Sequence, residues 1–232
     1  MSAHHPDDFT LLDYSAGSLD VAQALAVSVH LSYCRQCQEQ LKSLNALGGI
    51  ILAGSQPGGL TASEPEPETE RDTWASDEAF DALMDKLNAE AQSPAPGASH
   101  SPSASYHNPL ERYLPRPLEE LDWHQQTGSI ARYDLNPLVD NPGHRVALQK
   151  IKAGAKVPQH SHRGQELTVV LTGGFSDELG VYQQGDYIAR DPSHHHSPTA
   201  MQNEDCICLT VLDAPMRFTG PLMRWLNPLI RF

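Results

Sequence analysis

The chain has 232 residues and a formal net charge of −13 at pH 7, and its length suffices for two modest domains, each with its own core. No stretch approaches the ~20 consecutive apolar residues of a membrane span, and the start, MSAHHPDDF, lacks a signal-peptide pattern. We therefore expect a soluble, cytoplasmic protein without membrane contact. The acidic charge also argues against direct nucleic-acid binding, which requires a basic surface.

The negative charge is concentrated in the first part of the chain. Residues 1–92 hold 15 acidic and 4 basic residues, whereas residues 93–232 hold 14 and 12. Such an excess maintains solubility in many proteins. It also suits the docking of residues 1–92 on a basic protein surface.

Residues 7–53 predict three helices. Asp7 or Asp8 can cap a short first helix through Tyr14, with Gly17 as a natural stop, and Ser18 and Asp20 open a second over VAQALAVSVHL. A third begins at about Arg35 and continues past the glycines at 48–49. The apolar residues at helical spacing in the second and third helices are Val21, Leu25, Val29, Leu41, Leu44 and Leu47.

A histidine and two cysteines lie close together in the stretch HLSYCRQCQEQL. His30, Cys34 and Cys37 are spaced four and three apart, so their side chains can converge. Zinc prefers such imidazole and thiolate ligands and binds four of them in a tetrahedron; His4 or His5 can supply the fourth. A redox pair or packing cysteines are the alternatives, although no strand precedes the Cys-x2-Cys as in thioredoxin-like proteins. We expect a zinc site that helps these short helices to fold.

With this pattern, the segment from HPDDFTLLDYSAG to GGIIL resembles the zinc-binding anti-sigma domain of the ChrR type. The family signature is an N-terminal histidine followed by His-x3-Cys-x2-Cys across two helices. The resemblance implies that the helices bind an extracytoplasmic-function sigma factor and keep it from core RNA polymerase. Sigma factors present basic surfaces, which the acidic residues of this region suit. The zinc ligands implied are His5, His30, Cys34 and Cys37, with His4 as a competitor for the first position.

A fourth helix is predicted over residues 74–91, between a Pro/Gly/Glu-rich loop and a Ser/Pro-rich linker over residues 93–109. Asp77 and Glu78 suit its N-terminal end. Its apolar stripe is isolated, so it needs a partner surface in this chain or on another protein. The partner-binding candidates are Phe80, Leu83, Met84 and Leu87.

Residues 110–232 contain short apolar runs such as RVALQKI, LTVVLTGGF and CICLTVL, which predict strands. Between them, GAKVPQHSHRGQELTVVLTG has the spacing Gly-x5-His-x-His-x3-Glu-x6-Gly of the first cupin motif. His160 and His162 lie two apart on a strand and project to the same face, and Glu166 follows a short turn. Such ligands inside a barrel leave room for a fourth imidazole and open coordination positions. A metal-free cupin with vestigial histidines is the alternative.

The second cupin motif follows a Gly-Asp turn, Gly185-Asp186, and lies in HHHSP. The usual glycine before the histidine is absent, and three histidines compete. In ChrR-like proteins the ligand precedes Ser-Pro, so the resemblance assigns it to His196, with His194 and His195 as alternates. The His3Glu set suits Zn, Mn, Fe or Ni, and the resemblance favours zinc.

Cys206 and Cys208 lie two apart on a predicted strand and face the same way, which disfavours a disulfide between them. Core packing is one interpretation of this pair. A redox or ligand-exchange role near the metal is the other.

Together these patterns predict a two-domain α + β protein. Residues 1–92 form a helical zinc-binding anti-sigma domain, 93–109 a linker, and 110–232 an all-β cupin-like barrel that binds a metal and acts as a sensor. The resemblance implies a non-enzymatic anti-sigma factor that regulates transcription by releasing its sigma factor on an oxidative signal such as singlet oxygen. The alternative is a metal-dependent cupin enzyme, such as a dioxygenase, with a helical regulatory module. An enzyme needs a substrate pocket, whereas a sensor needs only a two-state response.

Overall fold

A computed structural model of the chain describes residues 3–54, 107–139, 141 and 143–219. They belong to two compact units, Met1–Gln38 together with Ser105–Phe232, and Glu39–Ala104. The predicted helix over residues 74–91 and most of the predicted linker lie outside the described residues. The candidates on that helix, Phe80, Leu83, Met84 and Leu87, therefore stay predictions.

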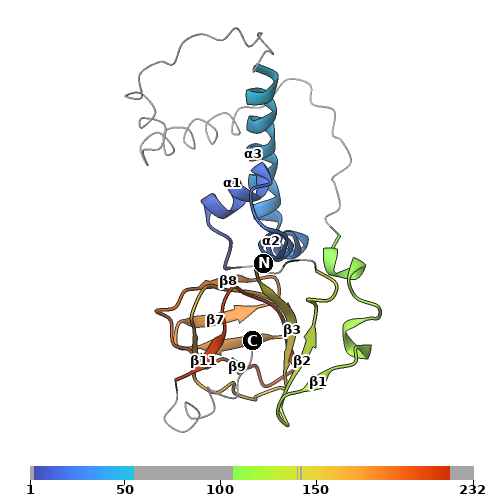
Figure 1. Cartoon of the computed structure of the whole chain (residues 1–232), viewed down its shortest axis with the longest axis vertical. Coiled ribbons are helices and arrows are strands. Elements are labelled where there is room, and N and C mark those ends of the chain that lie inside the picture. Colours follow the sequence, from blue (N-terminus) through green and yellow to red (C-terminus); the bar gives the residue numbers. More distant parts are fainter. Residues whose placement is uncertain (1–2, 55–106, 140, 142, 220–232) are drawn as a thin grey trace. The chain divides into compact units, whose positions relative to one another are not determined.

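The three N-terminal helices form where the sequence predicts them (Figure 1). They are α1 (Asp8–Ala16), α2 (Val21–Tyr33) and α3 (Arg35–Gly54). Asp7 caps α1 and Asp20 caps α2, each by accepting hydrogen bonds from backbone N–H groups of the first turn. α1 ends at Gly17, whose φ of 71° lies in the left-handed region that glycine adopts without strain. None of the described helices is long and apolar enough to span a membrane.

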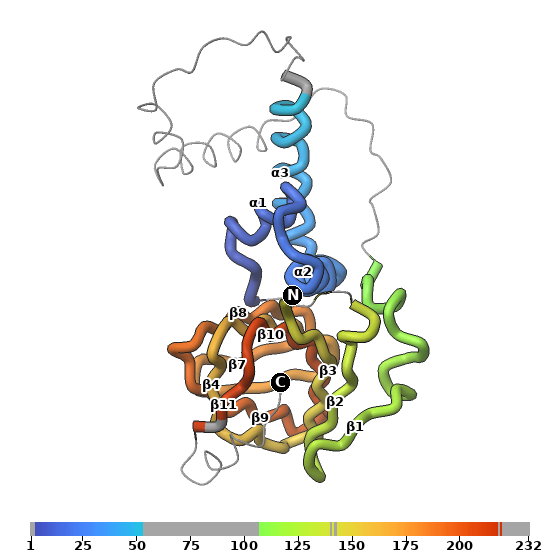
Figure 2. The backbone as a smooth tube through the Cα atoms, viewed as in Figure 1, coloured from blue at the N-terminus to red at the C-terminus, as the bar shows by residue number. Residues whose placement is uncertain are grey.

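The rest of the described chain contains strands, among them the predicted runs RVALQKI and CICLTVL, after two short 3-10 helices, η2 (Pro109–Arg112) and η3 (Leu118–Glu120). The strands are β1 (His124–Gln125), β2 (Ile130–Asp134), β3 (Arg145–Ile151), β4 (His160–His162), β5 (Glu166–Thr172), β6 (Gly174–Asp177), β7 (Gly180–Gln183), β8 (Tyr187–Arg190), β9 (Thr199–Ala200), β10 (Cys206–Leu212) and β11 (Met216–Phe218). Three antiparallel sheets, β1-β2-β3-β10-β5-β8, β11-β4 and β7-β6-β9, wrap around one another as a barrel (Figure 2).

Strand β10 is at the centre of the largest sheet, and all seven of its residues are buried. It pairs with β3 on one side and with β5 on the other, where the register shifts between Ile207 and Cys208. Strands buried on both faces are continuous apolar runs, which explains why CICLTVL stands out in the sequence. β5 pairs in turn with β8, in a register that places Glu166 opposite Arg190.

Helix α2 packs against the barrel within the first unit. It contacts β5, β8 and β10. At its N-terminus, the side-chain amide of Asn141 donates to Asp20 Oδ1 at 2.7 Å; near its C-terminus, the amide of Asn108 donates to the Tyr33 hydroxyl at 3.4 Å. The helix that carries His30 is therefore held directly on the barrel.

Candidate metal centres

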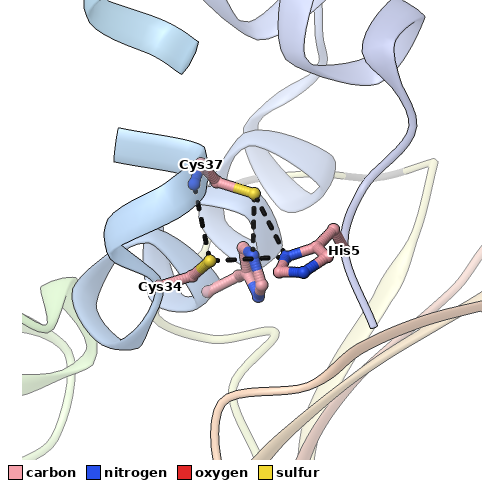
Figure 3. A group of neighbouring side chains, drawn as sticks. His5, Cys34 and Cys37 are labelled. Atoms are coloured by element: carbon pink, nitrogen blue, oxygen red, sulfur yellow. Dashed lines mark hydrogen bonds between the residues drawn. The ribbon is translucent and has the colours of Figure 1, made fainter. Parts of the chain in front are cut away.

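The structure brings His5, His30, Cys34 and Cys37 together between the segment that precedes α1 and the junction of α2 with α3 (Figure 3). The Nδ1 atom of His5 lies 3.3 Å from Cys34 Sγ and 3.4 Å from Cys37 Sγ. The Nε2 atom of His30 lies 3.3 Å from Cys37 Sγ. Zinc–sulfur bonds of about 2.3 Å and zinc–nitrogen bonds of about 2.0 Å place tetrahedral ligands roughly 3.5 Å apart. The group therefore has the composition and the spacing of a zinc site.

Burial has opposite effects on two of these side chains as metal ligands. His30 is fully buried, and this burial lowers its pKa to about 4, so the ring is neutral near pH 7. Its Nδ1 donates to the carbonyl oxygen of Gly185 at 2.7 Å, which leaves Nε2 as the ligand atom. Burial, together with the neighbouring Cys34, raises the pKa of the Cys37 thiol to about 12. A thiolate at Cys37 therefore requires a cation beside it, as zinc provides.

The structure separates the two adjacent histidines near the N-terminus. His5 lies in the group that could hold a metal ion, whereas His4 faces the barrel. The Nδ1 atom of His4 lies 3.2 Å from Asp186 Oδ2, and its ring meets that of Tyr182 at a centroid distance of 4.7 Å. The His4 side chain thus contacts residues of the barrel that lie far away in the sequence.

A second group, His160, His162, Glu166 and His196, is buried inside the barrel. His160 and His162 form the ends of β4, Glu166 begins β5, and His196 exchanges backbone hydrogen bonds with His160. One ligand atom from each of the four lies within 4.8 Å of the others. The segments named in the two cupin motifs therefore converge on one point.

Only one of the three consecutive histidines reaches this group. His196 is buried in it, whereas His194 lies 2.9 Å from the exposed carboxylate of Asp191. The His195 side chain is exposed. The position before Ser-Pro is thus the one that faces the barrel interior.

The ligand atoms of this second group face one another inside the barrel, where His162 Nε2 lies 3.4 Å from His196 Nε2. His160 Nδ1 donates to the Pro158 carbonyl at 2.8 Å, so its Nε2 is available. Glu166 Oε2 lies 2.9 Å from His162 Nε2. Burial opposes ionisation of Glu166, but its hydrogen bond with His162 and the charges of the three neighbouring histidines lower its pKa to about 2. A buried carboxylate beside three imidazole nitrogens fits a divalent transition metal.

Asp177 lies behind this group, and no motif in the sequence predicts it. Its carboxylate accepts a hydrogen bond from His196 Nδ1 at 3.3 Å and lies 3.6 Å from the Arg190 guanidinium. Burial opposes its ionisation, but the bond from His196 and the Arg190 charge contribute to a pKa of about 2. A carboxylate in this position fixes the tautomer of a metal-binding histidine and raises its basicity.

Comparison with known proteins gives these two groups a family context. Residues 116–215 match the family described as the ChrR Cupin-like domain. The anti-sigma-E factor ChrR of Cereibacter sphaeroides is 34% identical over 229 residues, which are 98% of this chain and 98% of that protein. The chain belongs to the ChrR family of anti-sigma factors. A crystal structure of Rhodobacter sphaeroides SigE in complex with the anti-sigma ChrR also matches, with a TM-score of 0.63 and 30% identity over 91% of this chain and 100% of the matched chain.

Membership of the ChrR family confirms two predictions made from the sequence. The fold class is the predicted one, with N-terminal helices followed by an antiparallel cupin-like barrel. The protein is a regulator of the anti-sigma type and not an enzyme. The dioxygenase-like alternative is therefore set aside.

In this ChrR-family chain, Asp177→Asn is expected to weaken metal binding in the barrel by about 10- to 100-fold. An amide can turn its NH2 group toward His196, which removes the acceptor that holds the ring. Titration of the metal-free protein in competition with a chelator measures the affinity. Asp191→Asn, at the exposed carboxylate beside His194, is the matched control and should bind as the wild type does. Equal affinities in the two variants would contradict the role given to Asp177.

Proposed function

We propose that the chain binds and inhibits an extracytoplasmic-function sigma factor and releases it in response to an oxidative signal, such as singlet oxygen. The similarity to ChrR over 98% of the chain carries this proposal, because the matched crystal structure is a complex of a sigma factor with its anti-sigma factor. The acidic excess of residues 1–92 supports it, since complementary charge guides association with a basic partner. Such a partner acts in the cytoplasm, which is the location we propose.

We assign the two parts of this activity to different regions of the chain. Residues 1–92 are proposed to bind the sigma factor, and residues 110–232 to sense the signal, with 93–109 as the linker. The stripe predicted on residues 74–91 is proposed to contact the sigma factor directly through Phe80, Leu83, Met84 and Leu87. The contacts of α2 with the barrel provide a second connection between the two regions besides the linker.

We propose that both groups of ligands bind metals. Two imidazoles and two thiolates at the N-terminal site are a ligand set for zinc, which would cross-link the segment before α1 with α2 and α3. Three imidazoles and a carboxylate in the barrel suit zinc or another divalent transition metal, and would leave coordination positions open to an oxidant. The ligands proposed are His5, His30, Cys34 and Cys37 at the first site and His160, His162, Glu166 and His196 at the second.

The size of the cavity beside the barrel site favours a small molecule as the signal. A cavity of about 30 Å³ is lined by His160, Glu166, His196 and Cys208, among others. Pockets for drug-sized organic ligands occupy roughly 300–1,000 Å³, whereas this cavity has room for one or two molecules of the size of water. A small oxidant fits such a space.

The proposal is tested by co-expressing the full chain with each extracytoplasmic-function sigma factor of its own genome. We expect one of them to co-purify in an equimolar complex that supports no transcription with core RNA polymerase until an oxidant is added. The free sigma factor is the positive control for transcription. Failure of the zinc-loaded chain to bind any of these sigma factors would contradict the proposal.

A further inference from the structure

Asp186 of the barrel holds the segment that carries His5. Its Oδ1 atom accepts hydrogen bonds from the backbone N–H groups of Ala3 at 2.7 Å and of His4 at 3.2 Å, and its Oδ2 lies 3.2 Å from His4 Nδ1. The next residue, Tyr187, donates its N–H to the His4 carbonyl at 3.0 Å. The carboxylate is almost fully buried, with 2% of its side chain exposed. The residue adjacent to a proposed zinc ligand is therefore fixed to the barrel from several directions.

The residue before Asp186 contacts a second proposed ligand directly. Gly185 accepts the hydrogen bond from His30 Nδ1 and donates its own N–H to the Val170 carbonyl of β5 at 2.9 Å. Its φ of 91° favours glycine at this position. Acceptors of this kind orient a metal-binding imidazole. Residues 184–186, which we call the β7–β8 turn, thus contact both histidine-bearing segments of the N-terminal site.

The strands on either side of the β7–β8 turn lead to the barrel site. Tyr182 of β7 hydrogen-bonds to Arg190 of β8 through its hydroxyl group, and its ring meets that of His4. The Arg190 guanidinium lies 3.6 Å from Asp177 Oδ2, which in turn accepts from His196. Arg190 also lies opposite Glu166 in the pairing of β8 with β5. Side-chain contacts therefore connect His196 with the N-terminal segment, and strand pairing places Glu166 beside the same β8.

We propose that Asp186 is a positioning residue for the N-terminal metal site and that the β7–β8 turn couples this site to the metal site of the barrel. The proposal rests on the two metal sites of the proposed function, but not on the identity of the partner or of the signal. Coupling between two sites requires a structural element with two conformations whose equilibrium is shifted by each of the sites. The turn meets this requirement, because a shift of His196 or Glu166 reaches β7 and β8, the strands that flank it, through Tyr182 and Arg190, and a shift of the turn alters the support of His30 and of the segment that carries His5.

Cobalt(II) bound to the full chain is the probe for this proposal. Thiolate ligands give cobalt a charge-transfer band in the near ultraviolet, so the band reports the N-terminal site and not the nitrogen and oxygen ligands of the barrel. Asp186→Asn is expected to release this cobalt to a chelator about 10- to 100-fold faster than wild type. Asp191→Asn, the matched control, should release it at the wild-type rate.

A milder variant covers the case in which Asp186→Asn does not fold. His4→Ala removes a side chain that is 41% exposed, together with its contacts to Asp186 and Tyr182. His4→Ala should also make cobalt release faster than in the wild type, whereas His195→Ala should leave the release rate unchanged. Equal release rates for His4→Ala and His195→Ala, or for Asp186→Asn and Asp191→Asn, would overturn the positioning role.

The coupling is measured by a double-mutant cycle. Replacement of His160 and His162 by Ala empties the barrel site, and this should change the rate of cobalt release from the N-terminal site by at least about fivefold. In the Asp186→Asn background the same replacement should change the rate much less. An equal change in both backgrounds, or none in either, would overturn the coupling.

The outcomes separate this proposal from the proposed function. An unsubstituted chain without the charge-transfer band would overturn the N-terminal metal site and the positioning role together. A chain with a normal band that binds no sigma factor would contradict the proposed partner alone.

Discussion

Cys34→Ser or Cys37→Ser is expected to abolish metal binding at the N-terminal site, and with it the fold of the helices and the binding of the sigma factor. Three ligands would remain, and the hydroxyl that replaces a thiolate is a far weaker ligand for zinc. Binding of structural zinc contributes about 10–16 kcal/mol to small zinc domains, so its loss is comparable with the whole 5–15 kcal/mol by which a typical domain is stable. α1 and α2 are 9 and 13 residues long, too short to be stable alone.

Metal content, the cobalt charge-transfer band, helical circular dichroism and sigma binding together measure this effect. The matched control is Cys206→Ser, at a buried free cysteine outside both groups of ligands. It should retain the N-terminal metal and the sigma factor. A Cys34→Ser protein that keeps its N-terminal zinc together with wild-type sigma affinity would show that this group is not a structural zinc site.

Replacement of both His160 and His162 by Ala is expected to give a repressor that holds the sigma factor and no longer responds to oxidant. The signal can shift the complex only through a site whose free energy differs between the bound and released states. The barrel group is that site under the proposed function, and its removal leaves the four N-terminal ligands in place. The coupling proposed above changes the rate at which the N-terminal metal exchanges, but not the metal occupancy of that site in the resting state. The resting complex with the sigma factor is therefore expected to persist.

A reporter of sigma-dependent transcription, with and without oxidant, measures this outcome. Replacement of His194 and His195 by Ala, two histidines adjacent to His196 but outside the buried group, should leave induction unchanged. Full induction in the His160/His162 variant would move the sensing role to the N-terminal site or to the buried pair Cys206 and Cys208, whose sulfur atoms lie 3.6 Å apart.

Local patterns predicted most of the elements that carry the ligands. Asp7 and Gly17 determine where α1 begins and ends, and Asp20 determines where α2 begins, through hydrogen bonds within a few residues, so the sequence alone locates these helix ends. The convergence of His30, Cys34 and Cys37 follows equally from helical spacing. The burial of β5 and β10 on both faces gives them apolar runs that are visible without a structure.

Long-range contacts explain what the sequence could not decide. His4 and His5 are equivalent by local criteria, and Asp186, 182 residues further along the chain, engages His4. The partnership of Asp177 with His196 joins β6 to the segment before β9, and neither residue's neighbours indicate the other. The Gly185-Asp186 pair was recognisable as a turn, but its contact with α2 depends on how the helix packs on the barrel.

The hydrogen bond between His30 and Gly185 joins residues that are 155 positions apart, and this separation has a consequence for biosynthesis. At 5–20 residues per second, Gly185 is synthesised roughly 8 to 30 s after His30. The four proposed N-terminal ligands are thus outside the ribosome while the barrel is still incomplete. Local helices form in microseconds, whereas non-local strand pairing is slow. We therefore expect the nascent chain to capture its N-terminal metal first, and the barrel to fold afterwards against a site that has already closed.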